Sequence, residues 1–253
     1  MQQRVLITAG AGGIGREIAR AFAANGAKVF VCDIDAEGLE TLAQEIEDLT
    51  TTLCDVSKRE DIERMVTSAI ESLGGLDVLV NNAGISGPTT PVDKMDPDDW
   101  DKVVQVNLNG TFNVTRLAIP HLKKSPAGVI IIISSAAGRF GYANRSPYSA
   151  TKWGLIGFTK TLSIELGEYG IRANAILPGA VEGPRLQRVF EGRAKVSSQS
   201  IEEVKDAAMA IQSIKRFVDP RDIAALAVFL ASDSAKSISG QLLPIDNDMQ
   251  KVS

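Results

Sequence analysis

Cysteine and histidine are scarce in this chain of 253 residues, which has two cysteines and one histidine. Cys32 and Cys54 are too few for a disulfide framework or a four-ligand zinc site, and we expect both to be buried thiols in strands. His121 lies on an amphipathic stretch without an acidic neighbour, which disfavours a Ser-His-Asp triad. We therefore expect no metal site and no histidine-dependent nucleophile.

Long apolar runs and an excess of positive charge are also absent. No apolar stretch reaches about 18 residues, and the N-terminus enters a strand pattern without the regions of a secretion signal. The formal net charge of −4 gives no general attraction to phosphate backbones or anionic lipids. With 44% hydrophobic and 23% charged residues, the composition is that of a globular protein. We expect a cytoplasmic protein with a small-molecule partner, rather than one that binds nucleic acid or a membrane.

Short runs rich in Val, Ile and Leu alternate with longer helical patterns along the chain. This alternation is typical of βαβ units around a buried parallel sheet. The predicted strands are residues 4–8, 28–32, 51–54, 78–80, 129–133, 172–177 and 241–245. Apolar residues at helical spacing predict helices over residues 14–24, 59–73, 97–123 and 149–169. The fold class is therefore α/β: a doubly wound Rossmann-like fold with a seven-stranded parallel sheet and helices on both faces.

A glycine-rich loop, residues 8–15, joins the first predicted strand to the first predicted helix. Glycines there let the backbone approach a pyrophosphate closely, because no Cβ intervenes. Asp33 ends the second strand, where a carboxylate binds the adenosine ribose hydroxyls and repels a 2′-phosphate. No Arg or Lys stands in the loop before Arg16 or directly after Asp33, which favours NAD over NADP. The alternative interpretations are a flexible surface loop and a turn-forming aspartate.

Further polar residues follow the third and fourth strands: Asp55, and Asn-Asn-Ala-Gly at residues 81–84. Ligands of open α/β sheets bind along this carboxyl edge. We therefore interpret residues 1–253 as a single dinucleotide-binding and catalytic domain. Residues 183–216 interrupt the alternation without a strand pattern, and we expect this insertion to cover the substrate.

Tyr148 and Lys152 stand four residues apart in Tyr-Ser-Ala-Thr-Lys, which stacks them on one face of a helix. A tyrosine acts as a general base when its pKa falls from about 10 toward 7, and a neighbouring cation supplies roughly 1 to 3 units of that shift. Taken alone, such a pair also arises often by chance.

Several motifs occur in one order along the chain: the glycine loop, Asn-Asn-Ala-Gly, Asn107 in Val-Asn-Leu-Asn-Gly, Ser135, Tyr148 to Lys152, and Pro178-Gly179. Together they resemble the classical subgroup of the short-chain dehydrogenase/reductase family over essentially the whole chain. The resemblance implies that Ser135 stabilises the substrate oxygen and that Tyr148 transfers the proton. Lys152 would lower the Tyr148 pKa and hold the nicotinamide ribose, and Asn107 would keep a water on Lys152. Ser134 competes for the serine role, but it falls one residue short of the thirteen-residue spacing to Tyr148.

The loop, the sheet edge and the resemblance together define the expected cofactor contacts. They are Gly10, Gly12, Gly13, Ile14, Gly15, Asp33, Ile34, Asp55, Val56, Asn82, Ala83, Gly84, Tyr148, Lys152, Pro178, Gly179 and Val181. Three departures from the family pattern stand out. Ala9 replaces the first glycine of the loop, Gly183 replaces a threonine that often contacts the carboxamide, and residues 245–248 replace Val-Asp-Gly-Gly.

Loops at residues 86–94, 136–145 and 183–216 are expected to contact the substrate. The candidate residues are Ser135, Arg139, Tyr142, Asn144, Arg145, Tyr148 and Arg185. The arginines suggest a pocket for a carboxylate, a sulfonate or a polyol, while solvated or structural arginines are the alternative. Arg145 is similar to the basic carboxylate-binding position of some hydroxybutyrate dehydrogenases in the family.

These features predict an NAD-dependent oxidoreductase that interconverts a secondary alcohol, in a hydroxy acid, sugar or polyol, and its carbonyl. The alternative enzyme is a 3-oxoacyl thioester (acyl-carrier-protein) reductase, which Asp33 disfavours. A non-catalytic NAD-binding regulator is the alternative of another class. The resemblance also implies a homotetramer or homodimer, formed through the helices that follow Asp96 and Tyr148.

Overall fold

The computed structural model describes residues 2–250 and contains one seven-stranded sheet of parallel strands. The spatial order is β3-β2-β1-β4-β5-β6-β7. From β1 the chain adds strands first on one side, up to β3, and then on the other side, from β4 to β7. The strands are β1 Arg4–Thr8, β2 Lys28–Asp33, β3 Thr50–Leu53, β4 Val78–Asn81, β5 Val129–Ile133, β6 Arg172–Pro178 and β7 Leu242–Ile245. The predicted fold is confirmed, and strand ends differ from the prediction by one residue. Cys54 is a correction: it is buried as expected but lies just after β3.

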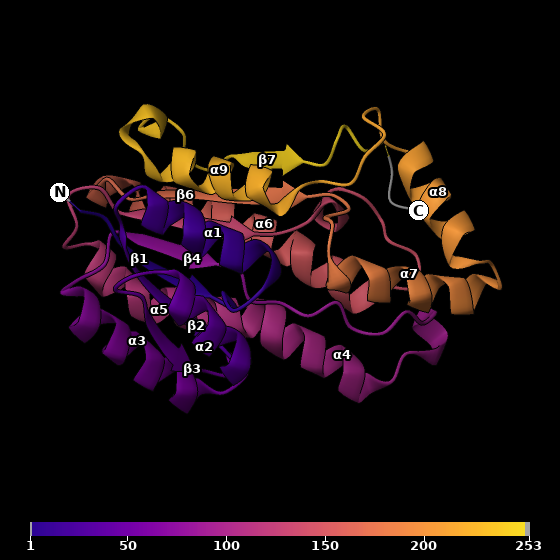
Figure 1. Cartoon of the computed structure of the whole chain (residues 1–253), viewed down its shortest axis with the longest axis horizontal. Helices are drawn as coiled ribbons and strands as arrows, with labels where there is room; N and C mark the ends of the chain where they lie inside the picture. The colour runs from indigo at the N-terminus through magenta and orange to yellow at the C-terminus, as the bar shows by residue number, and fades with distance from the viewer. Residues whose placement is uncertain (1, 251–253) are drawn as a thin grey trace.

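Helices cover both faces of the sheet (Figure 1). One face packs against α1 Gly13–Ala24, α2 Ala36–Glu45 and α9 Pro220–Ala231, and the other against α3 Arg59–Leu73, α5 Thr111–Leu122 and α6 Ser146–Leu166. Alternate residues of β1 serve the two layers. Val5 and Ile7 join the cluster that contains Phe22 of α1, whereas Leu6 joins the cluster that contains Met65 of α3. The sheet is thus buried on both sides, as its apolar strands predict.

The predicted helix over residues 97–123 is not one regular helix. It consists of α4 Pro97–Val104, a six-residue π-helical segment Gln105–Gly110, and α5. A Cβ at Gly110 would lie 2.8 Å from the Val56 carbonyl oxygen, so the segment runs unusually close to the loop after β3. Apolar periodicity does not report such a local widening, which is frequent at functional sites.

Other helix ends carry signals that explain the remaining differences. Asp35 and Asp219 cap α2 and α9, neither of which is among the predicted helices, and their carboxylates accept hydrogen bonds from Gly38 N and Arg221 N. The helix predicted over residues 149–169 begins earlier, at Ser146, and ends at Leu166 before a 3₁₀ turn. Tyr148 therefore lies inside the first turn of α6.

Residues 183–216 hold two helices, α7 Pro184–Ser197 and α8 Ile201–Ala210. They lie beyond the carboxyl end of the sheet, toward which the β7 arrow points (Figure 1). Phe190 of α7 packs against Phe217, with ring centroids 5.7 Å apart, in a small apolar cluster separate from the two sheet layers. Among residues 2–250, no helix is long and apolar enough to cross a membrane.

Candidate active site

Tyr148 and Lys152 lie one turn apart on α6, as their spacing predicts, with the Lys152 Nζ 5.7 Å from the centroid of the Tyr148 ring. Lys152 is 3% exposed, and its Nζ donates to the Ile133 carbonyl at 2.8 Å. Burial lowers the Lys152 pKa to about 8, an effect that Tyr148 opposes and Arg185 reinforces. The ammonium is therefore fixed against the end of β5, beside the phenol.

The Tyr148 pKa reflects opposing effects. Burial raises it, but the positive charges of Arg185 and Lys152, the hydrogen bond with Ser135 and the charge of Arg145 together outweigh burial. The net pKa lies below the ordinary tyrosine value of 10.0. Three cations and one hydroxyl thus favour the phenolate, which is the form that accepts a proton.

The two adjacent serines at the end of β5 point to different partners. The Ser134 hydroxyl is buried and donates to the Lys152 carbonyl at 2.9 Å, so it supports α6. The Ser135 side chain accepts a hydrogen bond from Ala137 N at 3.1 Å, and its hydroxyl contributes to the lowered Tyr148 pKa. Of the two serines, Ser135 is therefore the one whose hydroxyl acts on the Tyr148 phenol.

Asn107 is fully buried in the π-helical segment. Its Oδ1 accepts from Ile85 N at 2.8 Å, and its Nδ2 donates to the Ile85 carbonyl at 3.0 Å and to the Thr151 hydroxyl at 3.2 Å. A Cβ at Gly84 would lie 3.2 Å from the Asn107 Oδ1 and 3.5 Å from the Lys152 Nζ. Asn107, Gly84 and Lys152 therefore converge on one spot. Thr151 was not predicted; its place beside Lys152 is the only sequence signal for it.

The glycine loop has the shape of an anion cradle. A Cβ at Gly15 would lie 2.3 Å from the Ala9 carbonyl oxygen and 2.6 Å from the Asn82 Nδ2, so only glycine fits there. In contrast, Cβ atoms at Gly12 and Gly13 would meet no atom within 4 Å. No side chain caps the N-terminus of α1, so its backbone N–H groups face this open space. Such a cradle suits the pyrophosphate of a dinucleotide.

Backbone conformation accounts for one departure from the family pattern, Gly183, whereas at Ala9 it favours the family's glycine. Ala9 has φ 52°, a left-handed conformation in which a glycine is unstrained. Gly183 has φ 139°, where the threonine that it replaces would be strained. Asn247 and Asp248, at the places of the two glycines, have φ 56° and 54°, which asparagine and aspartate tolerate best among other residues.

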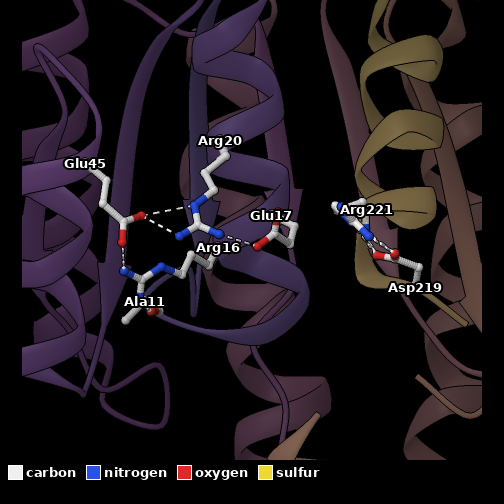
Figure 2. A network of polar contacts seen from close by, with 7 residues as sticks. All are labelled: Ala11, Arg16, Glu17, Arg20, Glu45, Asp219 and Arg221. Carbon is white, nitrogen blue, oxygen red and sulfur yellow. Dashed lines mark hydrogen bonds and ion pairs between the residues drawn. The ribbon is translucent and has the colours of Figure 1, made fainter. Parts of the chain in front are cut away.

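Asp33 ends β2 beside the glycine loop. Its Oδ2 accepts a hydrogen bond from Ala11 N at 2.9 Å, and its Oδ1 accepts one from Ile34 N at 2.7 Å. The nearest arginines along α1 have partners of their own. Arg16 and Arg20 both pair with Glu45 of α2, with Arg20 Nη2 2.6 Å from Glu45 Oε2 (Figure 2). Both of these arginines, at the end of the site that holds Asp33, are therefore already paired with a carboxylate.

The other expected cofactor residues lie along the carboxyl edge of the sheet. The Asn82 Nδ2 donates to the Ala9 carbonyl at 2.8 Å, and the Thr8 hydroxyl accepts from the N–H groups of Asn82 and Ala83. A Cβ at Gly179 would lie 2.8 Å from the Asp246 Cα, so the segment after β6 runs against the C-terminal segment. Ile14 lies in the first turn of α1 and Pro178 ends β6, whereas Asp55 and Val56 lie in the loop after β3. Val181 follows β6 and forms an isolated bridge with Val218.

The candidate substrate residues divide into two groups. Arg145 is 2% exposed, and its guanidinium Cζ lies 5.4 Å from the Tyr148 ring centroid; the Arg185 Cζ lies 5.8 Å from the same ring. The Tyr142 ring stands edge-on to Tyr148, with centroids 6.4 Å apart. Arg139 points elsewhere, because its Nη1 pairs with the Asp246 Oδ2 at 3.3 Å.

Asn144 and Arg193 complete the surroundings of the tyrosines. Asn144 is left-handed, with φ 60°, and its carbonyl accepts from Thr90 N. Arg193, in the insertion, was not assigned to the substrate from the sequence. Its Cζ lies 4.7 Å from the Tyr142 ring centroid, which places α7 over the tyrosines.

Curated proteins similar over nearly the full length are oxidoreductases. The chain is 36% identical over 248 residues to a 3-oxoacyl-acyl-carrier-protein reductase of Thermotoga maritima, covering 96% of each protein. It is 38% identical over 247 residues to a D-beta-hydroxybutyrate dehydrogenase of Cupriavidus necator, covering 95% of each.

Solved structures give the same picture. Actinorhodin polyketide ketoreductase with NADPH matches with a TM-score of 0.94 and 35% identity, covering 98% of this chain and 97% of that one. NAD⁺-bound xylitol dehydrogenase matches with a TM-score of 0.93 and 30% identity, covering 96% and 97%. The family model described as short chain dehydrogenase matches residues 3–194. With its fold, motif order and relatives in agreement, the chain belongs to the short-chain dehydrogenase family.

Proposed function

We propose that the protein is an NAD-dependent oxidoreductase that interconverts a secondary alcohol, in a hydroxy acid, sugar or polyol, and its carbonyl. The observation that carries the proposal is the lowered pKa of Tyr148, caused by cations and a hydroxyl that converge on one phenol. A phenol whose pKa is lowered in this way accepts a proton from an alcohol at a lower pH than an ordinary tyrosine does. When bound, NAD accepts the hydride from the alcohol carbon or returns it to the carbonyl.

In this mechanism each residue has a separate task. The Ser135 hydroxyl donates a hydrogen bond to the substrate oxygen, where charge develops. Tyr148 takes the alcohol proton in oxidation and returns it in reduction. Lys152 favours the phenolate electrostatically and holds the nicotinamide ribose. Asn107, which lies beside Lys152 and Gly84, holds the water that passes the proton on to solvent.

The proposed cofactor preference rests on the adenosine end. The Asp33 carboxylate accepts three backbone hydrogen bonds there, and a 2′-phosphate would meet its negative charge. The pairing of Arg16 and Arg20 with Glu45 leaves that end without an evident phosphate ligand. NAD therefore fits the site better than NADP, and an NAD preference suits oxidation.

The test is a screen of NADH formation over hydroxy acids, aldoses, polyols and cyclic alcohols, with Tyr148→Phe as the blank. We expect one of these classes to reduce NAD⁺ with the native chain and none with the variant. Efficient NADPH-dependent carbonyl reduction with poor NAD turnover would contradict the proposal. Normal function of Tyr148→Phe in the cell, with NAD binding intact, would favour the non-catalytic regulator.

The second candidate is a 3-oxoacyl thioester reductase. It is favoured by the similarity to the Thermotoga maritima reductase and to the polyketide ketoreductase. Asp33 argues against it if the cofactor is NADPH. Rates with NADH and NADPH on an acetoacetyl thioester separate the two candidates, because only the reductase is expected to turn over this substrate with NADPH efficiently.

We further propose a homotetramer or homodimer of a single-domain protein, and a cytoplasmic location. Apolar side chains on α5 and α6 remain exposed, with Phe112 49% and Trp153 50% exposed. Both side chains lie in the segments after Asp96 and Tyr148 that the sequence predicts to form the interface. Light scattering measures the mass of the assembly; a monomer at all concentrations would contradict this proposal.

A further inference from the structure

Three arginines surround the two tyrosine rings of the site. The Arg145 Cζ lies 5.3 Å from the Tyr142 ring centroid and 5.4 Å from that of Tyr148. The Arg185 Cζ lies 5.8 Å from the Tyr148 centroid, and the Arg193 Cζ lies 4.7 Å from that of Tyr142. Arg145 comes from the loop before α6, whereas the other two come from α7. The positive charge is therefore assembled from both sides of the pocket.

Among residues 2–250, no carboxylate pairs with the buried Arg145. Its Nη2 donates to the Ser86 carbonyl at 2.8 Å, but its Nε has no hydrogen-bond partner, and the residue is only 2% exposed. Burial lowers the Arg145 pKa; Tyr142 and Tyr148 oppose this effect, and the charges of Arg185 and Arg193 reinforce it. A buried charge of this kind is costly unless an anion pairs with it.

Other arginines of the chain differ from this group. Several lie within 4.0 Å of a carboxylate: Arg4, Arg16, Arg20, Arg64, Arg139, Arg216 and Arg221. Among the ion pairs within residues 2–250, none includes Arg145 or Arg185. Arg185 donates instead to the Gly84 carbonyl at 3.1 Å. The chain thus leaves two guanidinium groups without a carboxylate beside its general base.

We propose that this pocket binds a hydroxy compound that carries a doubly charged acidic group, a dicarboxylate or a phosphate monoester, through Arg145 and Arg185. The inference rests on the proposed function, because the same compound presents its hydroxyl to Tyr148. A guanidinium is a planar fork that pairs with two oxygens of a carboxylate or phosphate. A neutral polyol leaves the Arg145 Nε without a charged partner, and a monocarboxylate neutralises only one of the two cations.

Binding of small acids tests this inference without knowledge of the substrate. Malonate, inorganic phosphate, acetate and neutral acetamide are titrated calorimetrically into the full chain, with and without NADH, at a pH where phosphate is mostly a dianion. We expect malonate and phosphate to bind at least about tenfold more tightly than acetate, since each of them forms an additional charge-assisted pair with a guanidinium. Acetamide should not bind. The stronger of the first two identifies the class, dicarboxylate or phosphate ester.

Substitution of single arginines tests which side chains bind malonate or phosphate. Arg145→Met should weaken malonate or phosphate binding about 10- to 100-fold, and Arg185→Ala about tenfold, by loss of charge-assisted hydrogen bonds. Arg188→Ala is the matched control, since it removes an exposed charge from the same helix without a contact to either tyrosine. It should change the affinity less than about twofold. If Arg145→Met does not fold, Arg145→Lys and the exposed Arg185→Ala still decide.

The inference is overturned if malonate and phosphate bind no better than acetate, or if the Arg145 and Arg185 variants bind them as the native chain does. Turnover of neutral alcohols as efficient as that of hydroxy diacids and phosphate esters would also overturn it, while leaving the proposed function intact. Failure of NADH to bind contradicts the proposed function instead. The titrations without NADH then still decide whether the pocket takes a dianion.

Discussion

The two ends of the site handle charge differently. At the adenosine end, Arg16 and Arg20 pair with Glu45, and the Asp33 carboxylate accepts backbone N–H groups. At the substrate end, Arg145 and Arg185 donate only to backbone carbonyls in the described hydrogen bonds. At the adenosine end, these charged side chains all have partners within the protein before any ligand binds. At the substrate end, the two guanidinium groups have no carboxylate partner among residues 2–250. Under the two proposals above, the first end selects its ligand by repulsion and shape, and the second by attraction.

The largest effect is expected at the substrate end, from Tyr148→Phe. Loss of the group that exchanges the proton should lower kcat about 10²- to 10⁴-fold, as is typical of general acid–base residues. NADH binding at the adenosine end should persist, which fluorescence titration measures. Loss of cofactor binding in this variant would contradict the division of the site into a cofactor end and a substrate end that act independently.

At the adenosine end, Asp33→Ser should weaken NAD binding about 10- to 100-fold, because hydrogen bonds to a charged group are lost. The discrimination against NADP should fall at the same time, since the charge that repels the 2′-phosphate is gone. Ratios of kcat/KM for the two cofactors measure both changes. An unchanged ratio would mean that Asp33 does not set the preference.

Two glycines of the same loop allow a matched comparison. Gly15→Ala places a Cβ 2.3 Å from the Ala9 carbonyl oxygen, so it should cost about 1 to 3 kcal/mol of folding free energy and also weaken NAD binding. Gly12→Ala meets no protein atom within 4 Å in an extended backbone, so it should not lower the free energy of unfolding, while it weakens NAD binding. Denaturant titration and cofactor titration separate these effects. Equal stability losses would contradict the cradle geometry.

Arg185→Ala should shift the pH profile of oxidation. Arg185 lowers the Tyr148 pKa, so its removal raises that pKa, and the base becomes active only at higher pH. The acid limb of kcat/KM, which reports the free enzyme, should therefore move to higher pH. Arg16→Ala, at the adenosine end, is the control and should leave the limb in place. A shift in the opposite direction would contradict the assignment of Tyr148 as base.

The smallest effect is expected from Ala9→Gly. Relief of a left-handed alanine gains roughly 1 to 2 kcal/mol, and the greater freedom of glycine in the unfolded chain returns about 0.4 to 1 kcal/mol of it. The variant should thus be slightly more stable, by about 0.5 to 1 kcal/mol. Thermal unfolding checks this, and a lower Tm would mean that the strain at φ 52° is not real.

The adenosine end was more predictable from the sequence than the substrate end, for a physical reason. Glycines in a loop and an aspartate at a strand end act through backbone geometry, which local sequence specifies directly. The placement of Tyr148 beside Lys152 is equally predictable from the sequence, because one helical turn fixes their spacing. The positions of these residues depend on backbone geometry and on contacts between residues that are close together in the sequence.

The rest depends on contacts between distant segments. Arg139 was grouped with the substrate residues, but its partner is Asp246, which lies 107 positions further along the chain. The π-helical segment that carries Asn107 lies close to the loop after β3, and apolar periodicity encodes neither the segment nor the contact. Likewise, the absence of a carboxylate beside Arg145 is a property of the folded chain alone.

The central claim is that Tyr148 takes a proton while a hydride passes from an alcohol carbon to NAD⁺. The most direct measurement is a single turnover of the native chain with NAD⁺ and its best alcohol, in weak buffer with a pH indicator. The account predicts that NADH and protons appear in equal amounts, and that Tyr148→Phe produces neither at a comparable rate. NADH formation by Tyr148→Phe at the native rate would contradict it.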